Sequence, residues 1–130
     1  MAKTTQCCDC TVCTGDALEI LFQQKVLTTG AGRTDTGVHA RRLVVHVDLP
    51  EGQQTDLLQR KLNRLLPADV SVDRVCKVKA GAHARFDAVE RTYRYWLGQR
   101  KMPLCRDYVW RVEAPLDFEE MNVAAEALLG

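Results

Sequence analysis

The chain has 130 residues, of which 46% are hydrophobic and 27% charged, and its formal net charge is +1. This balance excludes a disordered tail and a collagen-like rod, and the length is that of one domain. The apolar runs are too short to cross a bilayer, and the first residues lack the apolar segment of a secretory signal. We therefore expect a cytoplasmic protein without a membrane partner.

Residues 1–16 form a cysteine-rich segment without hydrophobic periodicity. Four of its thiols lie within seven residues, at Cys7, Cys8, Cys10 and Cys13. Four thiolates this close could bind zinc, although structural zinc sites usually take their ligands from two separated pairs. The alternative is an irregular N-terminal segment outside the fold. Disulfides are disfavoured in the cytoplasm.

The first half of the chain then predicts one helix and two strands. Thr14 or Asp16 could cap a helix whose apolar face includes Leu18. A short strand is expected over residues 25–29, followed by a glycine-rich loop. The alternating sequence RRLVVHVDL, residues 41–49, predicts a second strand with one buried face.

The second half predicts two helices and three strands. An amphipathic helix is expected over Thr55–Leu66, with Leu58, Leu62, Leu65 and Leu66 on its apolar face. Strands are expected over residues 70–78, 89–97 and 106–113. Asp117 then caps a last helix whose apolar stripe includes Met121. This order favours an α/β (α+β) sandwich with a mixed or antiparallel sheet.

Charge is unevenly distributed along the chain. Between Arg74 and Arg111 there are ten basic and three acidic residues, whereas five acidic residues and no basic ones follow Arg111. A basic segment with interleaved aromatic residues suits a polyanion such as RNA. Solvated strand faces and loops would give the same pattern.

The loop GAGRTDTGVHA, residues 30–40, places Asp35 among glycines and basic residues. A phosphate-binding loop is one interpretation, but it usually opens a helix and has no carboxylate at its centre. A metal site using Asp35, His39 and His46 is a second, although the spacing is not typical of one. The third is a β-turn in which Thr34 and Asp35 bond their own backbone.

Two motifs favour a catalytic interpretation. GRTDTGVHA closely resembles the signature of the TruA family of tRNA pseudouridine synthases, G-R-T-D-x-G-V-H-A, and HARFDAVERTYRYWL resembles that family's H-A-R-F-x-A-x-x-R-x-Y-x-Y. A softer resemblance covers LNRLLPADVSV. Residues 17–130 follow the family's order and spacing, so the resemblance implies its pseudouridine-synthase-like sandwich, with helices on one face of the sheet.

The resemblance also assigns roles to four residues. Asp35 matches the catalytic aspartate, and Tyr93 the tyrosine that stacks on the target base. Arg33 matches the arginine implicated in displacing that base, and Arg85 an arginine near RNA phosphate. The ordinary alternatives are a cross-strand aromatic residue for Tyr93 and surface ion pairs for the two arginines.

The residue types fit the implied reaction, which cuts the C1′–N1 glycosidic bond of uridine and rejoins the uracil through C5. A carboxylate can assist this isomerisation without a cofactor or a metal. The base must leave its stack, and an aromatic side chain can hold it once flipped. The implied partners are tRNA, with the anticodon arm as target, and a second subunit in a homodimer.

The chain also departs from the family. Family members open with a strand carrying a Y-D-G-x-x-x-x-G-W-Q-x-Q type motif, and here the sequence is MAKTTQCCDCTVCTG. The family's second half, which closes the active-site cleft, has no counterpart either. We therefore expect residues 17–130 to be an N-terminal catalytic domain with weak or no turnover. The alternatives are a non-catalytic RNA-binding fragment and a cysteine-cluster metal protein.

Overall fold

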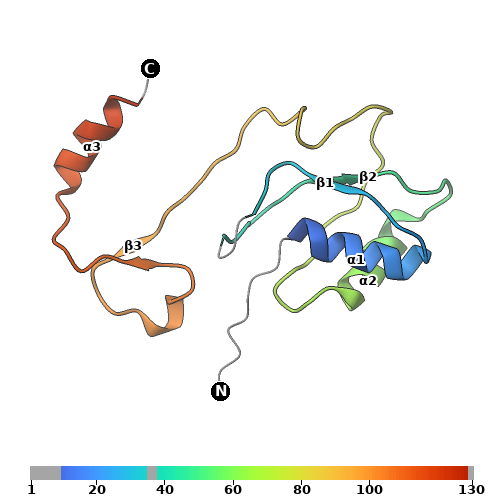
Figure 1. The fold of residues 1–130 in the computed structure, drawn as a ribbon, viewed down its shortest axis with the longest axis horizontal. Helices are drawn as coiled ribbons and strands as arrows, with labels where there is room; N and C mark the ends of the chain where they lie inside the picture. Colours follow the sequence, from blue (N-terminus) through green and yellow to red (C-terminus); the bar gives the residue numbers. More distant parts are fainter. Residues whose placement is uncertain (1–9, 35–37, 129–130) are drawn as a thin grey trace. The chain divides into compact units, whose positions relative to one another are not determined.

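A computed structural model describes residues 10–34 and 38–128, which divide between two compact units, Met1–Arg91 and Thr92–Gly130. The first unit contains α1 (Cys10–Phe22), β1 (Thr28–Gly30), β2 (Val45–Val47) and α2 (Thr55–Leu65). The second contains β3 (Leu97–Gly98), a 3₁₀ turn (Pro103–Cys105), β4 (Trp110–Arg111) and α3 (Phe118–Glu126). Figure 1 shows these elements along the chain. The mixed α/β class is thus confirmed at this coarse level.

The first helix begins earlier than the sequence predicts. Residues 10–16, expected to be irregular, belong to α1, and only the remainder of the expected segment lies outside the described residues. Thr14, a predicted cap, instead donates its hydroxyl hydrogen bond to the carbonyl of Cys10, at 2.6 Å. Threonine can make this bond inside a helix, which is why a cap residue alone does not fix the first turn. The helix ends at Phe22, and the next residue, Gln23, has a left-handed φ of 54°.

The two predicted strands around the glycine loop exist but are shorter than expected. β1 and β2 pair antiparallel, with Thr28 opposite Val47 and Gly30 opposite Val45. One further bond, from the Ala31 amide to the Val44 carbonyl at 2.8 Å, continues the pairing into the loop. The hairpin therefore fixes both ends of the loop that contains the first motif.

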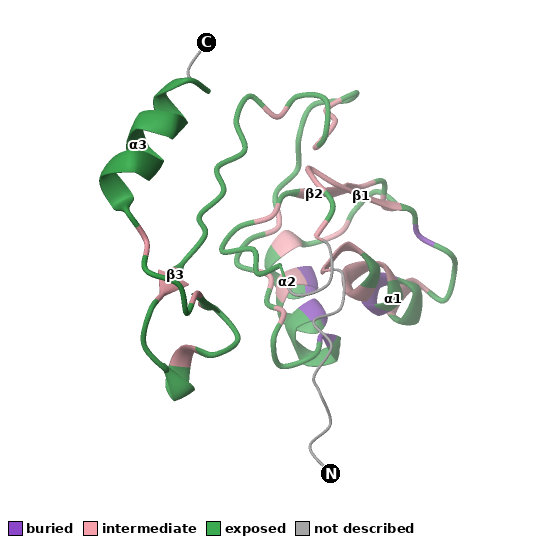
Figure 2. Ribbon diagram, turned by 60° about the vertical axis from the view of Figure 1, so that its left-hand side comes forward, coloured by how far each residue is buried: buried purple, intermediate pink, exposed green. Residues whose placement is uncertain are grey.

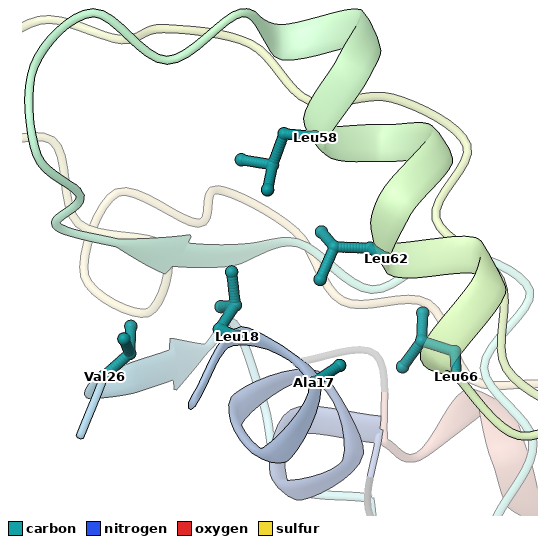
Figure 3. Close-up of a cluster of buried hydrophobic side chains, with 6 residues drawn as sticks. All are labelled: Ala17, Leu18, Val26, Leu58, Leu62 and Leu66. Atoms are coloured by element: carbon teal, nitrogen blue, oxygen red, sulfur yellow. The ribbon is translucent and has the colours of Figure 1, made fainter. Parts of the chain in front are cut away.

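The helix α2 confirms its prediction to within one residue, and together with the following residue, Leu66, it supplies half of the buried core. Leu58, Leu62 and Leu66 pack against Ala17 and Leu18 of α1 and against Val26 (Figure 3). Leu65, expected on the same face, is 41% exposed. Both helices lie on the same side of the β1–β2 pair (Figures 1 and 2). The core of this unit is therefore formed between the two helices and the hairpin.

The expected strand over residues 70–78 is absent from the described residues, although Val70, Val72 and Val75 do pack against the core. Polar side chains of α2 hold this segment instead. The Asn63 amide accepts from the Val72 amide at 2.7 Å and donates to its carbonyl at 2.9 Å, and Gln59 donates to the carbonyl of Asp73 at 2.6 Å. Because these side chains take the backbone groups of Val72, no strand partner is needed there.

The second unit has little regular structure and, in its described part, no buried residue (Figure 2). The expected strands over residues 89–97 and 106–113 reduce to β3 and β4, which pair in parallel with Leu97 opposite Trp110. A strand needs a neighbour along its length to satisfy its backbone groups. The described part of this unit offers one only at these positions.

The last helix begins where the sequence predicts. The Asp117 side chain accepts a hydrogen bond from the Glu120 amide at 2.9 Å, so the predicted N-cap is confirmed. Its apolar stripe is not covered within the described residues, and Met121 is 43% exposed. Among the described helices, none is both long and apolar enough to cross a membrane.

Candidate functional site

The loop that follows β1 starts against the first helix. A Cβ atom on Gly30 would lie 2.8 Å from the Thr11 hydroxyl and 3.1 Å from the Gly32 carbonyl oxygen, so only glycine fits without displacing a neighbour. Thr28 adds a hydrogen bond from its hydroxyl to the Thr11 carbonyl, at 3.2 Å. The helix α1 therefore sets where the loop leaves the hairpin. Arg33, three residues on, is exposed.

The second motif, HARFD at residues 83–87, folds into a compact turn with His83 at its centre. The Nδ1 atom of His83 accepts hydrogen bonds from the amides of Arg85 and Phe86, both at 3.2 Å. The Asp87 carboxylate accepts from the His83 amide at 2.8 Å, and the Asp87 amide donates to the His83 carbonyl at 2.9 Å. These bonds close the turn from both ends and leave Arg85 exposed at its tip.

This turn docks on β2 through a second histidine. The Ala84 amide donates to Nδ1 of His46 at 3.0 Å, and the centroids of the His46 and His83 rings are 4.5 Å apart. Phe86 stacks on the His83 ring with its centroid 4.2 Å away. His46 was considered above as a metal ligand together with Asp35 and His39. In the described parts of the chain, no three side chains of the metal-binding types are grouped to hold an ion.

Arg91 connects this turn to the glycine loop. Its Nε atom donates to the Ala31 carbonyl and its Nη2 atom to the Arg85 carbonyl, both at 2.9 Å. The structure thus brings together the two segments that carry Arg33 and Arg85, although they are far apart in the sequence. A single guanidinium group reaches both because its donors form a planar fork.

Comparison with known proteins finds relatives of this chain. Three curated proteins named tRNA pseudouridine synthase A are similar to this chain. The protein of Bacteroides fragilis is 49% identical over 118 residues, that of Bacteroides thetaiotaomicron 49% over 116, and that of Maricaulis maris 45% over 117. The matches cover 89%, 89% and 88% of this chain.

The chain is homologous to tRNA pseudouridine synthase A. It spans less than half the length of these relatives, since the matches cover 46%, 43% and 47% of them. No family model matches the chain.

The structure describes three of the four residues that the resemblance to tRNA pseudouridine synthase A singles out. Arg33 and Arg85 belong to the first unit and lie on the two segments that Arg91 joins. Tyr93 belongs to the second unit, outside a strand, with 64% of its surface exposed. Asp35 lies outside the described residues, as do Cys7 and Cys8 of the cysteine cluster.

The arginines of this tRNA pseudouridine synthase A homologue are largely open to solvent. Two ion pairs of the described basic segment, Arg106 with Asp107 at 3.5 Å and Arg111 with Glu113 at 3.2 Å, join residues close in sequence at the surface. Such pairs are worth little in water, so they do not compete strongly with a polyanion. Arg33 and Arg85 form no ion pair within the described residues.

Sequence reasoning placed Arg91 only in the basic segment suited to the RNA backbone, without a role of its own, and it did not single out His83. Both stand at fixed positions of the second motif, as the arginine of R-x-Y-x-Y and the histidine of H-A-R-F. That motif was the available signal. The sequence could not indicate that both side chains form hydrogen bonds with backbone groups, because every residue type carries the same backbone groups.

Proposed function

We propose that this chain carries the catalytic part of a tRNA pseudouridine synthase, which isomerises uridine to pseudouridine in the anticodon arm of tRNA. The observation that carries the proposal is the 49% identity to tRNA pseudouridine synthase A over 89% of the chain. The catalytic residue in this proposal is Asp35, and the reaction uses no cofactor.

The reaction moves one carbon–nitrogen bond to a carbon–carbon bond without net oxidation. The C1′–N1 bond breaks, the uracil turns, and C1′ bonds to C5. The hydrogen on C5 then leaves as a proton, and N1 gains one. In its ionised form the Asp35 carboxylate can add to the sugar or the base, or stabilise the charge that develops on C1′ as uracil departs.

Substrate binding in this proposal depends on the exposed basic and aromatic residues. Arg33 would help to displace the target base and Arg85 would lie near an RNA phosphate. Both lie on segments that Arg91 already joins, which supports their acting on one substrate. Tyr93 stacks on the uracil after it leaves the helix, which offsets about 1–3 kcal/mol of the cost of flipping. Because phosphate contacts release counterions, binding should weaken as salt rises.

The wider architecture is part of the same proposal. We propose that residues 17–130 belong to the N-terminal catalytic domain of such an enzyme, and that the enzyme is a cytoplasmic homodimer. The α1–α2 layer on one side of the β1–β2 pair supports a sandwich with helices on one face of its sheet.

The test is tritium release from tRNA labelled at C5 of uridine, because isomerisation frees that hydrogen. We expect release by the chain to be weak or absent. Any release should fall to background in Asp35→Ala and persist in Asp48→Ala, which removes an exposed carboxylate just after β2. Equal release by both variants would contradict the role of Asp35. No release combined with salt-sensitive tRNA binding would favour the RNA-binding alternative, and no binding at all would contradict both.

A further inference from the structure

We propose that Arg91 is a positioning residue that fixes the loop carrying Arg33 relative to the turn carrying Arg85. The proposal rests on the function proposed above, which gives those two arginines their contacts with RNA. It assigns Arg91 itself to two backbone carbonyls, those of Ala31 and Arg85, and not to the substrate.

The geometry around the guanidinium group supports this assignment. Both bonds are 2.9 Å long and come from different nitrogens, so the group is held in one plane by two segments at once. Hydrogen bonds from a charged donor are stronger than neutral ones. A Cβ atom on Gly32 would be 3.9 Å from Nε and 4.0 Å from Cδ of Arg91, so the arginine stem lies beside the loop backbone at ordinary contact distance.

The two segments are formed without Arg91. The loop is anchored by the bond from the Ala31 amide to the Val44 carbonyl, and the turn is closed by His83 and docked on His46. Arg91 is also exposed, so its removal opens no cavity in the core. Its loss should therefore loosen the outer bonds of both segments, those of the Ala31 and Ala84 amides, and leave the core of the unit folded.

Lysine distinguishes this role from a direct phosphate contact. A lysine at position 91 keeps the positive charge and can bind phosphate, but its single ammonium group lacks the planar fork that spans two carbonyls. If Arg91 positions the segments, Arg91→Lys should resemble Arg91→Gln. If Arg91 acts only through its charge, Arg91→Lys should resemble the unsubstituted chain.

The first experiment measures residue-resolved amide hydrogen exchange of the 130-residue chain and needs no activity. In both Arg91 variants we expect exchange at the Ala31 and Ala84 amides to rise together, by about tenfold, the scale of hydrogen bonds to a charged group. The Leu66 amide, which donates to the Leu62 carbonyl in the core, should not change. The control Arg64→Gln removes an exposed arginine from the last turn of α2 and should leave all three amides unchanged.

The second experiment measures tritium release against tRNA concentration. We expect Arg91→Lys to lower kcat by about tenfold or more while changing KM by less than about threefold, because misplacement of contacting groups slows the reaction more than it weakens binding. If the unsubstituted chain releases no tritium, the proposed function fails for this chain, and the exchange result alone decides the role of Arg91.

Three results would overturn the proposal. One is exchange in Arg91→Lys equal to that of the unsubstituted chain. Another is a rise at only one of the Ala31 and Ala84 amides. The third is an equal rise at Leu66, which would make Arg91 a general stabiliser of the fold and not a link between two segments.

Discussion

Replacing Leu62 by alanine should destabilise the first unit far more than the same replacement at Leu65. Leu62 is 3% exposed and belongs to the buried cluster of Figure 3, whereas Leu65 is 41% exposed. Both changes remove the same atoms from the same helix, so the difference in helix propensity cancels. What remains is the difference in burial.

The magnitude follows from the atoms removed. At about 0.8 kcal/mol per buried methylene-sized group, the loss at Leu62 is roughly 2–2.5 kcal/mol before any cavity is counted. A residual cavity brings such changes to about 2–5 kcal/mol. The cluster has six buried residues with half-buried ones around it. These neighbours can move partly into the space left by Leu62, so the loss should be about 3 kcal/mol. At Leu65 we expect roughly 1 kcal/mol or less.

The assay is urea unfolding of both variants, followed by far-ultraviolet circular dichroism. A loss of about 3 kcal/mol would be a large part of the roughly 5–15 kcal/mol typical of small domains. Equal losses in the two variants would refute the reasoning, because α2 would then present a different face to α1 than the one described.

Two further predictions concern positions that fix local geometry. Gly30→Ala should lower the free energy of unfolding by about 1–3 kcal/mol because its new Cβ meets the Thr11 hydroxyl, while Gly32→Ala, with only ordinary contacts, should stay within about 0.5 kcal/mol. Matched urea curves test this pair, and a neutral Gly30→Ala would contradict the close approach. Asp117→Ala should destabilise α3 by about 1 kcal/mol because the Glu120 amide loses its acceptor. Helical ellipticity measures that loss, and an unchanged signal would contradict the capping role.

Helices were the best-predicted elements, because their signals are local. The apolar spacing over residues 55–66 and the Asp117 cap each lie within one or two turns of chain, and both helices form where they were expected. The start of α1 was wrong because Thr14 can serve a helix interior as well as a cap. Strands were predicted less well. The alternating pattern over residues 70–78 and 89–97 favours a strand, but a strand forms only where a neighbouring strand can accept and donate its backbone hydrogen bonds.

The candidate site, too, was predictable from the sequence only in part. The motifs name Asp35, Arg33, Arg85 and Tyr93, and these roles remain predictions. The linking role of Arg91 emerged only from the structure, because its bonds go to the carbonyls of Ala31 and Arg85, and any residue type provides a carbonyl. No pattern of side chains could have indicated where those carbonyls would meet.

By itself, the sequence determined the family resemblance, the two well-signalled helices and the identity of the charged residues that make RNA a suitable ligand. The tertiary structure decided which leucines of α2 are buried, which predicted strands find partners, and which arginine joins the two motifs. The physical reason is that side-chain chemistry and helical periodicity depend only on residues that are close together in the sequence. Burial, strand pairing and bonds to backbone depend on segments that are distant in the chain and meet only on folding.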